Sequence, residues 1–188
     1  MLTFNEMVAS HVRALEATSA LVAGVDSLTV PTPCADWDLA DLIGHMIGQN
    51  TGFAAAVTDG AAPVAAYASV PVSLDDLASR WEESATRIRE AFSGADPAAT
   101  IHLAEFDFSP TIEMALGMQL LDAAVHAWDV ATALGSDYRP ADATVSYVLD
   151  MARQIAARPG GTPVFDAPLE TVGDPWIDAL RLLGRRAG

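Results

Sequence analysis

The chain has 188 residues, of which 51% are hydrophobic and 19% charged, and this composition predicts one folded domain over residues 1–188. Its net charge of −15 comes from 25 acidic and 10 basic residues, so we expect no nucleic-acid partner. No apolar run is long enough to span a bilayer, the first residues lack a signal-peptide pattern, and a single cysteine excludes an internal disulfide. We therefore expect a cytoplasmic protein without a membrane partner.

Two helices are predicted in the first third of the chain, over residues 3–23 and 38–58. Thr3 and Glu6 have the spacing of a capping box at the start of the first helix. The second helix follows a connection that contains two prolines, which favour extended backbone. The residue that caps this second helix is predicted to be Asp36 or Asp38.

Three glycines, Gly44, Gly48 and Gly52, recur every four residues along the predicted helix 38–58. Each glycine in a helix costs about 1 kcal/mol relative to alanine. Their shared spacing places them on one face, so the pattern predicts close approach of a neighbouring element or of a ligand.

The middle of the chain is predicted to contain one helix between two less regular segments. Residues 59–72 read as a loop, and residues 95–108 as irregular or extended. The helix is predicted to begin at Ser73, with two aspartates in its first turn, and to end near Phe92. Leu74 is predicted to face inward.

A long, largely apolar helix is predicted next, from Ser109 to about Leu134. Ser109 is the expected N-cap, with Pro110 in the first helical position. Gly135 stands where a glycine commonly ends a helix.

The remaining residues are predicted to form a helix over 141–157, an extended pair over 162–173 and a last helix over 174–184. Pro159-Gly160-Gly161 is expected to stop the first of these helices. With no internal repeat or linker, the elements predict an all-α protein, an antiparallel four-helix bundle with a short extra C-terminal helix and a small β-hairpin.

Four polar residues form a stripe on the helix that ends near Leu134. They are Gln119, Asp122, His126 and Asp129, and at helical spacing they fall within an arc of roughly 80°. Asp122 and His126 lie one turn apart and can share a proton or a metal ion. Two other interpretations remain open: the stripe is the solvated side of an amphipathic helix, or its residues hydrogen-bond one another without further function.

His45 is the natural third member of a metal site, because it lies in the middle of another predicted helix among apolar neighbours. A lone histidine of this kind is more often a hydrogen-bonded core residue. If the two helices are neighbours, however, His45, Asp122 and His126 would suit Zn²⁺, Ni²⁺ or Fe²⁺ and leave positions open for water or substrate.

The other polar residues have less defined roles. Cys34 is either a reactive thiol or, as we expect, a small buried residue, because no basic residue lies near it in sequence. Asp129 either orients His126 or caps a neighbouring element. His11 and His102 have no partner pattern, and we interpret both as structural or exposed.

Two segments together resemble a known family. TPCADWDLADLIGHMIG (Thr32–Gly48) and VHAWDVATALG (Val125–Gly135) are similar to motifs of the mycothiol-dependent maleylpyruvate isomerase-like family, a group of DinB-like four-helix bundles from actinobacteria. The ending ALRLLGRR (Ala179–Arg186) also looks like that of the family.

The resemblance implies a divalent metal, zinc above all, held by His45, Asp122 and His126. It also implies that the metal activates the thiol of mycothiol, which then attacks or is transferred to a small electrophile. The isomerase pattern has Glu where Asp122 stands, so the carboxylate of this chain is one methylene shorter.

Three hypotheses follow. The first is a metal-dependent transferase or isomerase with a thiol cofactor. The second is a non-catalytic metal-binding or regulatory bundle, and the third is a bundle in which the three polar residues only hydrogen-bond. The sequence does not set the oligomeric state, and a homodimer is one of the states it allows.

Overall fold

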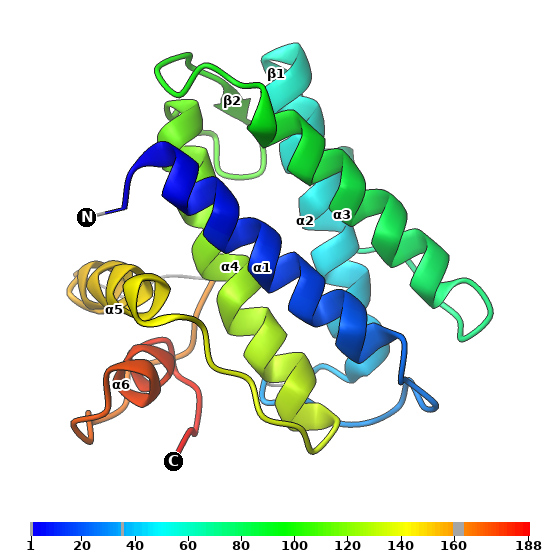
Figure 1. The fold of residues 1–188 in the computed structure, drawn as a ribbon, viewed down its shortest axis with the longest axis vertical. Coiled ribbons are helices and arrows are strands. Elements are labelled where there is room, and N and C mark those ends of the chain that lie inside the picture. Colours follow the sequence, from blue (N-terminus) through cyan, green and yellow to red (C-terminus); the bar gives the residue numbers. More distant parts are fainter. Residues whose placement is uncertain (1, 35, 160–163) are drawn as a thin grey trace.

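The computed structural model describes residues 2–34, 36–159 and 164–188. These residues form mainly α-helices, with a two-stranded sheet and a short 3-10 helix (Figure 1). The helices are α1 (Phe4–Val22), α2 (Leu39–Asp59), α3 (Leu77–Ser93), α4 (Ile112–Ala133), α5 (Asp142–Ala156) and α6 (Pro175–Leu182). The short elements are β1 (Ala61–Ala62), η1 (Val64–Tyr67) and β2 (His102–Leu103).

The first four helices form the predicted four-helix bundle. In Figure 1, α1 and α4 run in one direction, and α2 and α3 run in the other. Residues 67–70, in the connection between α2 and α3, return along α2 from Gly52 toward Gly44, so α3 can start near the beginning of α2. The pattern is that of a bundle with a long crossover connection.

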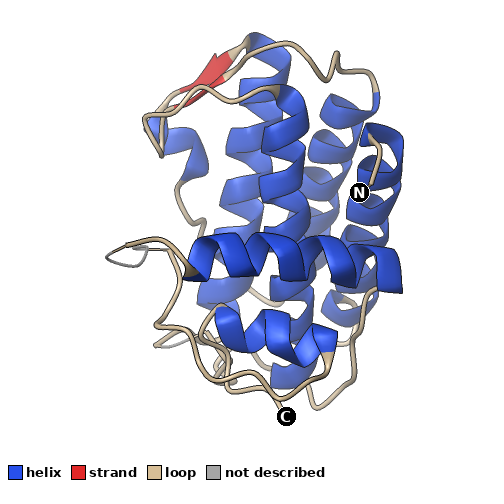
Figure 2. Cartoon of the chain, turned by 90° about the vertical axis from the view of Figure 1, so that its left-hand side faces the viewer, coloured by secondary structure: helices blue, strands red, loops and turns tan. Residues whose placement is uncertain are grey.

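The helices α5 and α6 form a second layer against α4. Figure 2, seen from the side where these two helices lie in Figure 1, shows both of them crossing in front of the bundle. Their apolar faces share a core with the second half of α4, separate from the core between α1, α2, α3 and α4. The second half of α4 is therefore enclosed from both sides.

Among the four bundle helices, two starts agree with the sequence and two do not. Thr3 and Glu6 form the capping box of α1, and Asp38 rather than Asp36 caps α2. The start predicted at Ser73 is wrong, because Ser73 and Asp76 close a separate turn and α3 begins only at Leu77. Leu74 was expected to face inward, but 52% of it is exposed because it lies in that turn.

The predicted cap of α4 is also wrong. Thr111, not Ser109, accepts the hydrogen bond from the Met114 N–H, and the helix begins at Ile112. The carbonyl of Pro110 accepts from Ile101, which keeps Pro110 in the preceding extended segment. Gly135 follows α4 with a φ of 66°, as predicted.

The small sheet differs from the expected hairpin. Its strands are parallel, with Ala61 opposite His102 and Ala62 opposite Leu103. Residues 164–173, within the segment 162–173 where an extended pair was predicted, contain no strand; residues 162 and 163 lie outside the described part of the chain. Gly160 and Gly161, expected to stop α5, also lie outside it.

None of the helices described is both long enough and apolar enough to cross a membrane.

Candidate metal centre

Helix α4 brings Asp122 and His126 together at its enclosed second half. They are one turn apart, and Nε2 of His126 lies 3.4 Å from Oδ1 of Asp122. His126 is only 5% exposed, whereas 25% of the Asp122 side chain remains accessible. The pair is thus buried on the imidazole side and open to solvent on the carboxylate side.

Helix α2 supplies His45 to the same place, because α2 and α4 pack against each other. The rings of His45 and His126 lie 5.3 Å apart and nearly perpendicular. One ligand atom from each of His45, Asp122 and His126 lies within 4.8 Å of the others, an arrangement that can hold a metal ion. The structure therefore brings together the three residues that the sequence predicted.

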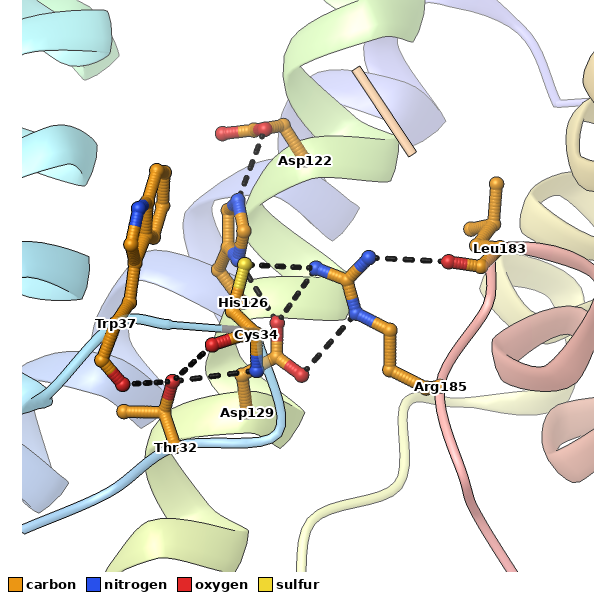
Figure 3. A network of polar contacts seen from close by, with 8 residues as sticks. All are labelled: Thr32, Cys34, Trp37, Asp122, His126, Asp129, Leu183 and Arg185. Carbon is orange, nitrogen blue, oxygen red and sulfur yellow. Dashed lines mark hydrogen bonds and ion pairs between the residues drawn. The ribbon is translucent and has the colours of Figure 1, made fainter. Parts of the chain in front are cut away.

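Trp37, from the loop before α2, covers one side of this cluster. Its ring lies 4.8 Å from that of His45 and 6.4 Å from that of His126. The loop is held in place by Thr32, which donates to the carbonyls of Cys34 and Trp37 (Figure 3).

Behind His126 lies an ion pair between Asp129 and Arg185, of which the sequence pattern identified only Asp129. Nδ1 of His126 lies 2.9 Å from Oδ2 of Asp129, and Arg185 donates to both oxygens of Asp129 at 3.3 and 3.0 Å (Figure 3). Of the two roles considered for Asp129, contact with His126 is the one observed. Arg185 was missed, because no pattern links the C-terminal tail to α4.

These charges shift the pKa values of the cluster. Burial lowers the pKa of His45. Burial alone would also lower the pKa of His126, but Asp122 and Asp129 raise it to about 9. The pKa values of both aspartates are lowered despite their burial, chiefly by His126. The cluster therefore combines ionised carboxylates with one histidine that favours its neutral form and one that readily holds a proton.

Cys34 is half-buried beside this network. Nη2 of Arg185 lies 3.6 Å from its Sγ, although no basic residue is close to it in sequence. Burial nevertheless raises the pKa of Cys34 to about 11, against the opposing effect of Arg185. The thiol is therefore protonated at neutral pH, which argues against a nucleophile, although Cys34 is half-buried and not fully buried as expected.

The polar stripe on α4 is not the solvated side of the helix. Gln119 is 2% exposed and Asp129 is fully buried. The remaining histidines lie outside the metal-ligand cluster: His11 is buried against the ring of Phe92, and His102 bonds to Ser109.

One turn beyond His45 on α2, the buried Gln49 donates to both oxygens of Glu105, at 3.1 and 3.0 Å. Glu105 comes from the turn after β2, and burial raises its pKa. No sequence pattern paired these two residues, which lie 56 positions apart.

A bundle of this topology belongs to the class of DinB-like helical proteins. Residues 11–131 match the family of the mycothiol maleylpyruvate isomerase N-terminal domain, and the chain belongs to this family. It is also 30% identical over 177 residues to two sequences from Mycobacterium tuberculosis, the uncharacterized proteins MT0763 and Rv0738, with 90% of this chain and 85% of each relative covered.

Two solved structures have the same fold. They are crystal structures of the mycothiol-dependent maleylpyruvate isomerase and of a histidine-to-alanine mutant of it, with TM-scores of 0.68 and 0.69. Each is 14% identical to this chain, and the match covers 87% of this chain and 75% of the solved one.

Proposed function

We propose that the chain is a divalent-metal-dependent enzyme that uses a mycothiol-type thiol as cofactor and acts on a small electrophile, as a transferase or an isomerase. The observation that carries this proposal is the convergence of His45, Asp122 and His126 within 4.8 Å. Family membership supports the thiol, because the solved relatives are mycothiol-dependent by name. A reduced thiol cofactor suits the cytoplasm, where we place the protein.

The donor set fits a divalent metal. In a tetrahedral zinc site with bonds of roughly 2.0–2.2 Å, neighbouring ligand atoms lie about 3.4 Å apart. On α4, Nε2 of His126 and Oδ1 of Asp122 already have this separation, 3.4 Å. The His45 side chain needs only a small movement to join them. Two imidazoles and one carboxylate suit Zn²⁺ best, with Ni²⁺ or Fe²⁺ as alternatives.

The residues around the donors determine what can happen there. A divalent metal at this position would favour the thiolate form of a bound thiol. Asp122 contributes one negative charge, so two positive charges from the metal leave room for one thiolate. The accessible side of Asp122 is the side from which cofactor and substrate would approach, while Trp37 covers the rings of His45 and His126.

Elemental analysis of protein purified without a histidine tag tests the metal directly. We expect about one divalent metal per chain, strongly reduced in His45→Ala and in His126→Ala. His102→Ala is the matched control, because His102 bonds to Ser109 outside the cluster. Wild-type protein without metal after incubation with zinc would overturn the proposal.

The chemistry is tested by incubating zinc-loaded protein with mycothiol and a panel of small electrophiles, including maleylpyruvate. Loss of free thiol, or isomerisation with the thiol conserved, is the expected result. Either activity should disappear in Asp122→Asn.

A non-catalytic metal-binding or regulatory module is the second candidate. It is favoured by Asp122, which stands where the isomerase pattern has Glu. Metal binding without any thiol-dependent reaction would support it. If Asp122→Glu then gains a thiol-dependent activity, the shorter side chain of Asp122 explains why the natural chain lacks that activity.

A further inference from the structure

Arg185 is a buried cation behind the proposed metal site. It is 4% exposed, and its side chain donates to both oxygens of Asp129 and to the carbonyl of Leu183. An arginine that grips a carboxylate at two points fixes its orientation, which a lysine cannot do equally well. Figure 3 shows the guanidinium facing Asp129, with His126 on the other side of that carboxylate.

The oxygen of Asp129 that Arg185 holds at 3.0 Å is the same one that lies 2.9 Å from Nδ1 of His126. Because Arg185 donates to both oxygens of Asp129, this carboxylate acts as the acceptor toward His126, and Nδ1 of His126 must carry the hydrogen. The other ring nitrogen, Nε2, then points to Asp122. The contact therefore decides which nitrogen of His126 is offered to a metal.

The end of α6 aims Arg185 at Asp129. Gly184 has a φ of 83°, which turns the chain, and the N–H of Arg185 donates to the carbonyl of Leu180 at 2.9 Å. The ring of Phe165 lies 5.7 Å from the guanidinium carbon. The side chain is thus placed by a short helix and a turn, more than fifty residues after the last candidate ligand.

We propose that Arg185 is a positioning residue of the metal centre: through Asp129 it holds the His126 imidazole with Nε2 directed at the metal position. The family match ends at residue 131, so this part of the site comes from the C-terminal segment outside the matched region. The effect on metal binding rests on the proposed function, whereas the effect on the His126 hydrogen bond does not.

Metal affinity provides the first test. Partners of this kind typically change metal affinity by about 10- to 100-fold. We expect a loss of this size in Arg185→Met, measured by zinc competition against a chelator, and a smaller loss in Arg185→Lys. Co²⁺ substitution should also show an altered visible spectrum. Arg186→Met is the matched control, because Arg186 is the exposed neighbour. It should leave the zinc affinity and the Co²⁺ spectrum unchanged.

A double-mutant cycle separates positioning from general stability. If Arg185 acts through Asp129, then Arg185→Met should weaken zinc binding in the natural background and have little further effect in Asp129→Asn. An equal loss in both backgrounds, or none in the natural one, would overturn the proposal. Should Arg185→Met fail to fold, the cycle is run with Arg185→Lys, and the same outcomes decide.

Metal-free protein gives a readout that is independent of the proposed function. The proton on Nδ1 of His126 should appear as a slowly exchanging downfield proton resonance in the natural protein and in Arg186→Met. It should exchange rapidly in Arg185→Met and more slowly in Arg185→Lys. A natural protein that binds no zinc would refute the proposed function alone, and an unchanged resonance in Arg185→Met would refute the role of Arg185.

Discussion

The carbonyl oxygen of Ala68 occupies the space that a β-carbon at Gly48 would need. In the same connection, the carbonyl oxygen of Val70 lies against Gly44 and the ring of Tyr67 lies against Gly52. The crossover to α3 therefore returns along the glycine-rich face of α2, and its contacts at Gly44 and Gly48 are made by backbone carbonyls.

Gly48→Ala should destabilise the protein, although alanine is the better helix former. The gain in helix propensity is about 1 kcal/mol, whereas forcing an extra carbon into a packed site costs about 1–3 kcal/mol or more. Urea unfolding monitored by circular dichroism measures the balance. Gly94→Ala is the control, because nothing lies within 4 Å of its added carbon; a Gly48→Ala protein as stable as the natural one would contradict the close contact.

Local patterns predicted much of the fold. The caps at Thr3 and Asp38 and the glycine at 135 depend on neighbours within a few residues, so the sequence displays them directly. The crossover was not predicted, because residues 59–72 have no periodicity and their path is set by contacts with α2. The cap of α4 was misplaced because Ser109 and Thr111 both suit that role, and hydrogen bonds to the preceding segment, such as that from Ile101 to Pro110, select Thr111.

At the candidate site, too, local spacing was predictive, whereas contacts between distant segments were not. Asp122 and His126 share a helix face, and helical spacing was enough to pair them. His45 required α2 and α4 to be neighbours, an assumption that the bundle confirms. Arg185 reaches Asp129 across 56 positions from a turn after the last helix, and no spacing rule connects such residues.

A second prediction concerns Gly117, which lies against the hydroxyl of Tyr147 where α5 crosses α4. Gly117→Ala would collide with that hydroxyl, so Tyr147 must shift, and this cost should cancel most of the gain of about 1 kcal/mol in helix propensity. In a Tyr147→Phe background the colliding oxygen is absent, so the same substitution should stabilise the protein by up to about 1 kcal/mol. Thermal unfolding of the four proteins gives the comparison, and equal effects in both backgrounds would show that the hydroxyl is not the obstacle.

Buried His11 predicts a loss of stability in acid. Burial lowers its pKa from 6.5 to about 4, so the unfolded chain takes up this proton first as the pH falls. The corresponding stability is complete above pH 6.5 and is lost between pH 6.5 and 4, by up to about 3 kcal/mol. Urea unfolding with a chelator present should show a shallower decline in His11→Gln, and parallel declines would contradict this account.

The protonation of His126 predicts a loss of stability toward alkaline pH when no metal is bound. Its pKa is raised to about 9, so its protonation stabilises the fold fully below pH 6.5, and this contribution is lost as the pH rises through 9. Chelator-treated protein should therefore lose stability from pH 6.5 to 9.5. In Asp122→Asn, which removes the largest favourable influence on that proton, the loss should be smaller; an equal loss would assign it to another group.

Zinc binding should release the proton of His126. Asp122 has a lowered pKa and is already ionised, and burial favours neutral His45, so neither has a full proton to lose at pH 7.5. His126, with a pKa of about 9, must lose the proton on Nε2 before that nitrogen can bind a metal. Isothermal titration calorimetry at pH 7.5 in two buffers of different ionisation enthalpy should report release of about one proton. The number should fall toward zero by pH 10, and zinc affinity should rise over the same range. Binding without proton release at pH 7.5 would mean that His126 is not a ligand or that its proton is not held by Asp122.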